Sequence, residues 1–204
     1  MKPILFNTEM VRAILEGRKT VTRRVIKLPE GMGGRPIGSS YDNNDPAGFF
    51  YPCGIKRAPY MINDVLYVRE TWREYITALG EKKRYEYRAS CPDIIDFLFK
   101  WKPSIHMPKE AARLFLRVTD VRVEKLRDMK LMDILAEGIT LDRNELRDPN
   151  IALVTAREKF SELWDSTAGK RGTPEYYAHN WYGNPFVWVI EFEVISKEEA
   201  MKEL

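Results

Sequence analysis

The chain has 204 residues, of which 44% are hydrophobic and 31% are charged, and its net charge is only +3. This composition suffices to bury a hydrophobic core and excludes an intrinsically disordered chain. The sequence contains neither an apolar run long enough to cross a membrane nor a signal peptide, so we expect a cytoplasmic protein. At this length we expect a single domain, residues 1–204.

The hydrophobic periodicity predicts an α+β fold. In chain order we expect a strand at 2–6, a helix at 7–17, strands at 20–26, 62–72 and 112–126 (the last with a break near Asp120), helices at 128–139 and 151–166, a strand at 185–195 and a frayed helix at 196–204. Because the strands do not alternate regularly with helices, we expect a small curved sheet, mixed or antiparallel, that closes as a β-barrel flanked by helices.

Two segments interrupt this pattern. Residues 28–61 are rich in Gly, Pro, Asn and Asp, and so long a stretch without secondary structure is typical of a functional or mobile segment. Residues 73–105 are rich in aromatic residues, and within them we expect a strand at 82–89 and a short amphipathic helix at 92–101. We therefore interpret both segments as insertions.

Positive charge is concentrated at the amino end. Residues 1–27 contain seven Lys and Arg residues against two Glu, and GRKTVTRR at 17–24 holds four of these cations and two threonines. An anion-binding face would carry such an asymmetry, but so would an ordinary solvated surface. The sequence leaves both interpretations open.

The cysteines and histidines do not indicate a metal site. Cys53, Cys91, His106 and His179 lack the close spacing that is typical of structural metal ligands. We therefore expect no metal and no cofactor.

Several stretches taken together resemble the ASCH domain family of the PUA-like superfamily. They are the helix with GRKTVTRR behind it, NDVLYVRETW, RLFLRVTDVRVEKL, ILAEGI and FVWVIEFEVI, and their combination is similar to the larger members carried by phages and prophages. Asn63 departs from the pattern, because the family commonly has glycine there. The resemblance implies a PUA-like barrel and, as partner, RNA or a modified nucleoside.

The resemblance further implies a metal-independent amidohydrolase that acts on N4-acetylcytidine or a related modified base. Carried over by motif, Thr22 is the nucleophile, Lys19 is the base that takes its proton, and Glu137 is the acid that protonates the leaving amine. A lysine with its ordinary pKa of about 10.4 is almost fully protonated at pH 7, so Lys19 needs a lowered pKa. Burial and nearby arginines would lower this pKa, whereas a charged Glu137 would raise it.

Other side chains are candidates for binding substrate or RNA. They are Arg18, Arg23, Arg24, Arg69, Glu70 and Trp72. For Arg69 and Glu70, a cross-strand ion pair is an equally good explanation. Four tryptophans could stack on a base, although tryptophans at strand ends more often belong to the core; these are Trp72, Trp101, Trp181 and Trp188.

Three alternatives to the amidohydrolase stay open. A non-catalytic RNA-binding module would need only the basic amino-terminal face. Ribonuclease activity is a weaker alternative, because no pair of histidines lies near the basic cluster in the sequence. In the third alternative neither residue is catalytic: Lys19 is a solvated turn residue, and Thr22 is present because threonine favours strands.

Overall fold

The computed structural model describes residues 1–27, 35–37, 48–51, 54–76 and 83–202. It has a mixed α+β fold in which most strand pairs are antiparallel, as the sequence predicted. The chain forms two compact units: the first contains Met1–Gly17, Asp64–Arg117 and Glu193–Leu204, and the second contains Arg18–Asn63 and Val118–Phe192. None of the described helices is long and apolar enough to cross a membrane.

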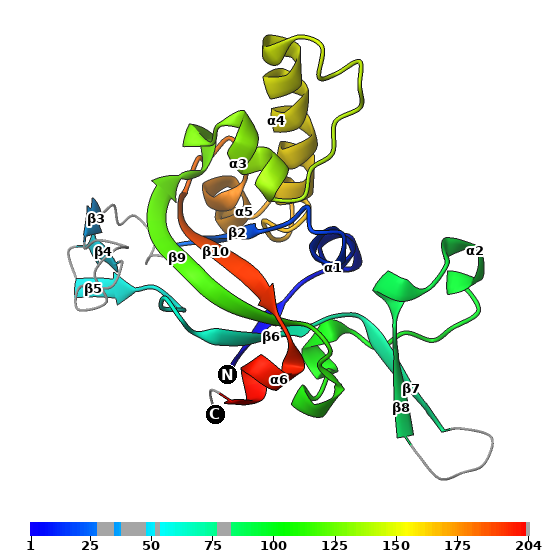
Figure 1. Cartoon of the computed structure of the whole chain (residues 1–204). Helices are drawn as coiled ribbons and strands as arrows, with labels where there is room; N and C mark the ends of the chain where they lie inside the picture. The colour runs from blue at the N-terminus through cyan, green and yellow to red at the C-terminus, as the bar shows by residue number, and fades with distance from the viewer. Residues whose placement is uncertain (28–34, 38–47, 52–53, 77–82, 203–204) are drawn as a thin grey trace. The chain divides into compact units, whose positions relative to one another are not determined.

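The main sheet has five strands in the order β1-β6-β9-β10-β2. These are β1 (Lys2–Leu5), β6 (Val65–Arg69), β9 (Phe115–Lys125), β10 (Phe186–Ile195) and β2 (Val21–Val25). The two long strands, β9 and β10, lie side by side and contribute residues to both units (Figure 1). The pairings among the described residues leave β1 and β2 as edge strands, so the closed barrel stays a prediction.

In the first unit, α1 (Thr8–Leu15) follows β1, which pairs in parallel with β6. The side chain of Asn7 caps α1 by accepting a hydrogen bond from the amide of Met10 at 2.8 Å. Gly17 ends this segment with a φ of 72°, a left-handed conformation that glycine adopts without steric cost. Both helix ends lie where the sequence predicted them.

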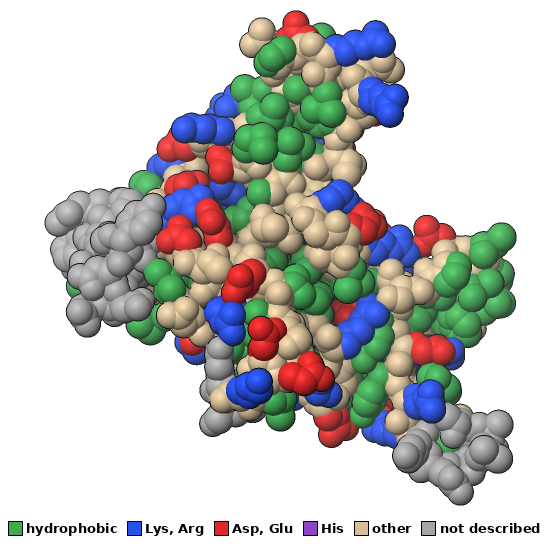
Figure 2. All heavy atoms as spheres, viewed as in Figure 1, with side chains coloured by type: hydrophobic (Ala, Val, Ile, Leu, Met, Phe, Trp, Pro, Cys, Tyr) green, Lys and Arg blue, Asp and Glu red, His purple; other side chains and the backbone are tan. Residues whose placement is uncertain are grey.

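The remainder of the first unit covers the segment that we interpreted as the second insertion. Its elements are β7 (Trp72–Ile76), β8 (Lys83–Tyr87), η1 (Arg88–Ser90), α2 (Asp93–Asp96), η2 (Ser104–His106) and η3 (Lys109–Ala111), with α6 (Lys197–Lys202) near the end of the chain. β8 confirms the strand predicted at 82–89, whereas the helix predicted at 92–101 is only four residues long. Hydrophobic side chains gather on the surface over α2 (Figure 2).

In the second unit, a small sheet lies within the Gly- and Pro-rich segment. Its three strands, in the order β3-β4-β5, are β3 (Arg35–Ile37), β4 (Gly48–Tyr51) and β5 (Gly54–Arg57). The expectation that residues 28–61 lack secondary structure was therefore wrong for these strands, because antiparallel pairing satisfies their backbone despite an unfavourable composition. Residues 28–34, 38–47 and 52–53 of the predicted insertion lie outside the described residues.

The core of the second unit lies between its helices and the sheet. The helical elements are η4 (Leu126–Asp128), α3 (Leu131–Ala136), α4 (Pro149–Asp165) and α5 (Pro174–His179), of which α5 was not predicted. Along α4 every fourth side chain is buried, and Ala156, Phe160 and Trp164 join a hydrophobic cluster with Val21 and Val187. The buried face of α4 therefore belongs to the core.

β9 also corrects the sequence-based expectation, because the strand continues without interruption through Asp120. Asp120 accepts a hydrogen bond from Nη1 of Arg122 at 2.8 Å, and Glu124 accepts one from Nε of Arg122 at 2.7 Å. Residues two positions apart share one face of a strand. These polar side chains therefore satisfy one another on that face and do not signal a break.

Candidate functional site

Two cations of the segment GRKTVTRR, Lys19 and Arg23, lie beside Glu137 within the second unit. Lys19 lies just before β2 and forms an isolated antiparallel bridge with Glu137, the residue that ends α3. The Thr20 amide donates a hydrogen bond to the Ala136 carbonyl at 2.9 Å, which joins the start of β2 to the end of α3. Gly138 has a φ of 98°, so the chain can turn away directly after Glu137.

The Lys19 side chain is buried, and its ammonium group makes three hydrogen bonds. Nζ lies 2.5 Å from Oε2 of Glu137, 3.1 Å from the Glu137 carbonyl oxygen and 2.8 Å from the Val21 carbonyl oxygen. Burial lowers the pKa of Lys19 from its usual value; Glu137 opposes this shift, and Arg24 and Arg23 add to it. Lys19 is only 1% exposed, so the interpretation of Lys19 as a solvated turn residue is excluded.

The Glu137 carboxylate is shared between two cations. Its second oxygen, Oε1, accepts a hydrogen bond from Nη1 of Arg23 at 3.1 Å, and the side chain of Arg23 is itself buried. An unpaired charge is costly in a protein interior, so each member of this Lys19–Glu137–Arg23 cluster depends on the others. The arrangement places one carboxylate, held from both sides, beside an amine with a lowered pKa.

Thr22 lies next to this cluster but is not bonded to it. It is 2% exposed, and because side chains alternate along a strand, it faces the side of β2 opposite to Arg23. Among the described residues, no hydrogen bond joins the Thr22 hydroxyl to Lys19. The contact that a nucleophile would need with its base is therefore not formed in this structure.

Two further arginines of the cluster lie close to Glu137. Nη1 of Arg18 donates a hydrogen bond to the Gly138 carbonyl at 2.5 Å, which supports the turn after Glu137. Burial lowers the pKa of Arg24, while the charges of Tyr60 and Glu137 partly offset this effect. By strand alternation, Arg24 lies on the same face of β2 as Thr22. Lys19, Arg23 and Arg24 thus all interact electrostatically with the Glu137 carboxylate.

The other three predicted residues lie in the first unit, where their contacts are structural. Glu70 is 1% exposed and accepts hydrogen bonds from Nε and Nη2 of Arg113, both at 2.9 Å. Nε of Arg69 donates to the Met107 carbonyl at 3.0 Å. Trp72 is buried in the core of this unit. Glu70 therefore pairs with Arg113, which the sequence did not indicate, and not with Arg69.

Two residues that extend the buried cluster were not predicted from the sequence. Glu124 accepts a hydrogen bond from Nη2 of Arg23 at 3.4 Å, and its other oxygen accepts from Arg122. The sequence could have indicated Arg122 and Glu124, because Asp120, Arg122 and Glu124 alternate along β9 and place opposite charges on one face. The network therefore leads from buried Glu137 to the partly exposed side chains of β9.

The described residues contain no group of three or more His, Cys, Asp or Glu side chains that could hold a metal ion. Cys53, one of the residues considered from the sequence, lies outside the described residues. His179 is half-buried, and burial lowers the pKa of its imidazole.

Similarity to known proteins does not identify the site. No protein-family model matches the chain, and neither a curated protein nor a solved structure matches it significantly. The chemistry assigned to the site therefore rests on its own residues.

Proposed function

We propose that the chain is a member of the ASCH family, with the closed PUA-like barrel of that superfamily, and that it hydrolyses the acylated amino group of N4-acetylcytidine or a related modified base without a metal. The observation that carries this proposal is the 2.5 Å hydrogen bond between the buried groups of Lys19 and Glu137. Thr22, Lys19 and Glu137 are the three residues that the chemistry uses.

The Lys19–Glu137 hydrogen bond supports both proton-transfer roles at once. Movement of one proton from Nζ to Oε2 converts the ammonium and carboxylate into an amine and a carboxylic acid. The amine can then take the Thr22 proton, and the acid can protonate the leaving nitrogen. Burial favours the amine form of Lys19, because desolvation penalises its ammonium form.

The reaction would proceed through an acylated threonine. Thr22 Oγ attacks the acyl carbonyl carbon as Lys19 takes its proton, and the bond from that carbon to N4 breaks as Glu137 protonates the amine. Water then attacks the ester carbonyl carbon: the Glu137 carboxylate takes a proton from this water, the Lys19 ammonium returns its proton to Thr22 Oγ, and the carboxylic acid leaves. Because Lys19 does not contact Thr22 in this structure, substrate binding has to bring the two side chains together, as catalytic hydrogen bonds often tighten only in the complex.

The two arginines of β2 have different roles in this proposal. Arg23 occupies Oε1 of Glu137, which leaves Oε2 as the oxygen that exchanges a proton with Lys19. Its charge also stabilises the carboxylate once the acid has given up its proton. Arg24 shares a strand face with Thr22, so its guanidinium is the group that would stabilise the negative oxygen of the tetrahedral intermediate.

The RNA-binding module is less well supported as an alternative. Lys19 and Arg23 are buried and bound to Glu137, so these two cations of the basic cluster do not form an exposed surface for phosphates. Phosphate contacts made elsewhere would appear as binding that weakens steeply with salt.

The test of the proposed function is release of cytidine from N4-acetylcytidine by the purified, chelator-treated protein, followed by liquid chromatography. Thr22→Ala should abolish turnover. Thr20→Ala is the matched control, because Thr20 lies two residues away and its side chain is exposed, and this variant should retain turnover. If both variants retain turnover, Thr22 is not the nucleophile. If the wild type itself is inactive, RNA binding becomes the better proposal.

A further inference from the structure

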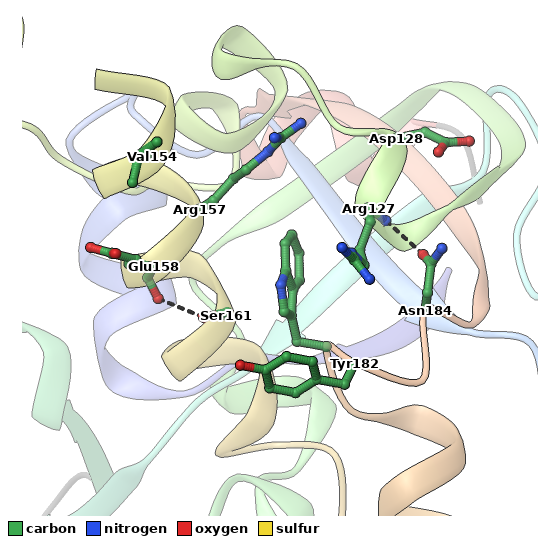
Figure 3. Close-up of a pocket in the computed structure, with 9 residues that line it drawn as sticks. Arg127, Asp128, Val154, Arg157, Glu158, Ser161, Tyr182 and Asn184 are labelled. Carbon is green, nitrogen blue, oxygen red and sulfur yellow. Dashed lines mark hydrogen bonds between the residues drawn. The ribbon is translucent and has the colours of Figure 1, made fainter. Parts of the chain in front are cut away.

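A pocket lies within the second unit, outside the Lys19–Glu137 cluster. It has a volume of about 500 Å³ and is lined by η4, α4 and the turn that precedes β10 (Figure 3). Pockets that bind small molecules fall in the range of roughly 300 to 1,000 Å³. None of the residues given a role in hydrolysis lines it.

The charges of this pocket are arranged asymmetrically. Arg127 from η4 and Arg157 from α4 point toward its interior, whereas the carboxylates of Asp128 and Glu158 point away (Figure 3). Within the described part of the chain, the Arg127 guanidinium has no hydrogen-bond partner. Nε of Arg157 is buried and likewise has no acceptor. Nη2 of Arg157 donates to the Met129 carbonyl at 3.4 Å, so Nε is its unpaired buried donor, and Arg127 adds an exposed positive charge. Because buried donors are normally paired, this arrangement favours an anionic ligand.

Aromatic side chains form the other part of the pocket. Trp181 packs edge-on against Phe160, with ring centroids 6.0 Å apart and an angle of 71° between the rings. Tyr182, the next residue, is 83% exposed. Folding gains little from an aromatic ring that remains in water, whereas such a ring offers a flat surface on which a base can stack.

The turn that carries these rings is held by several specific contacts. The Trp181 amide donates to Oδ1 of Asp165 at 2.7 Å, and the Gly183 amide donates to Oδ1 of Asn180 at 2.8 Å. A Cβ atom at Gly183 would lie 2.4 Å from the Tyr177 carbonyl oxygen, so only glycine fits there. The backbone of the turn and the Trp181 ring are therefore held in place, which reduces the entropy cost of binding.

We propose that this pocket binds one nucleotide, with the base stacked on Tyr182 and Trp181 and the phosphate between Arg127 and Arg157. Arginine suits this role because its planar guanidinium can donate two parallel hydrogen bonds to a phosphate. The nucleotide is either free or part of a single strand, and both present the same base and phosphate. This site is additional to the proposed hydrolysis and does not depend on it.

Isothermal titration calorimetry on the full chain at low salt tests this proposal. The probes are adenosine 5′-monophosphate, adenosine, ribose 5-phosphate and a single-stranded oligoadenylate; adenine avoids confusion with a site for cytidine. The monophosphate should bind more tightly than adenosine or ribose 5-phosphate, each of which lacks one of the two recognised groups. If the oligoadenylate binds more tightly than the monophosphate, the pocket takes a nucleotide of a single strand. If the two affinities are equal, the pocket takes a free nucleotide.

Substitutions of lining residues test whether the nucleotide binds in this pocket. Tyr182→Ala should weaken binding by about five-fold or more. Arg127→Gln should also weaken it, and for the oligoadenylate it should reduce the slope of log affinity against log salt by about 0.7. Arg147→Gln is the matched control, since it removes the same charge at an exposed residue of the second unit that does not line the pocket.

Thr22→Ala separates the two proposals, because it should abolish hydrolysis and leave nucleotide binding unchanged. The pocket proposal is overturned if the wild type binds neither the monophosphate nor the oligoadenylate. It is equally overturned if Tyr182→Ala and Arg127→Gln bind like the wild type, or if Arg147→Gln loses as much affinity as Arg127→Gln.

Discussion

Lys19 Nζ lies 2.5 Å from Glu137 Oε2, and this contact joins two buried side chains that are 118 residues apart in the sequence. It connects the start of β2 to the end of α3, and Arg23 holds the carboxylate from its other oxygen. The contact therefore joins two distant segments of the second unit, and it opposes the lowering of the Lys19 pKa by burial. The predictions for activity and for stability both follow from it.

The activity should fall at high pH. The reactive form of the pair, the Lys19 amine with the Glu137 acid, holds one shared proton, so kcat/KM should decrease as this proton is lost through the pKa of Lys19. Burial lowers this pKa, so the fall should be centred below about 10.4, the ordinary value for lysine. The pH dependence of kcat/KM for N4-acetylcytidine gives the midpoint. A midpoint above the ordinary lysine value would contradict the assignment.

Arg24→Gln should move this fall in activity to higher pH. Arg24 is one of the cations that lower the pKa of Lys19, so its removal makes the ammonium form more stable. The same pH profile measures the change, and Arg147→Gln, which removes an exposed charge, should leave the midpoint in place. If Arg24→Gln lowers the rate without moving the midpoint, its charge does not act on Lys19.

Glu137→Gln should impair hydrolysis in a way that depends on the leaving group. The amine of cytidine needs a proton as it leaves, whereas p-nitrophenolate leaves without one. The variant should therefore lose turnover of N4-acetylcytidine by about 100-fold or more and lose much less with p-nitrophenyl acetate. Equal losses with both substrates would show that Glu137 does not act as the acid.

Glu137→Gln should also destabilise the protein. Removal of the carboxylate leaves Lys19 and Arg23 buried without this partner, and breaking such a cluster costs about 3–5 kcal/mol of unfolding free energy. Urea denaturation measures the loss. Glu162→Gln, at an exposed position of α4, should change the stability by less than about 0.5 kcal/mol. Similar stabilities of the two variants would show that Glu137 is not a structural centre.

Glu70→Gln should affect stability without affecting catalysis. Glu70 is buried and accepts two hydrogen bonds from Arg113, which is partly exposed, so we expect a loss of about 1–3 kcal/mol. The value of kcat/KM, measured where the variant is folded, should equal that of the wild type. A large change in KM with normal stability would return Glu70 to the set of substrate-binding residues.

Local patterns in the sequence predicted the helices at 7–17 and 151–166. The cap at Asn7, the left-handed Gly17 and the buried face of α4 each depend on residues within a few positions of one another. Asn63, which stands where the resemblance expects glycine, has a φ of 69°, so it takes the conformation that glycine would take. The turn is therefore compatible with the family pattern.

Contacts between distant segments did not follow from these patterns. The pairing of Glu70 with Arg113 depends on the register between β6 and the segment before β9, and the contact of Arg23 with Glu124 depends on the β9–β10–β2 order. Hydrophobic periodicity carries no information on register between strands far apart in the sequence. The meeting of Lys19 and Glu137 was anticipated only because the family resemblance names both residues.

The most direct test of the account is detection of the acylated threonine. The protein is mixed with N4-acetylcytidine, quenched in acid within the first turnover and mapped by peptide mass spectrometry. We predict an acetyl group on Thr22 in the wild type and no acetyl group in Lys19→Ala, where the base is missing. Release of cytidine with no acetyl group on Thr22 at any time point, or with the group on another residue, would contradict the proposed mechanism.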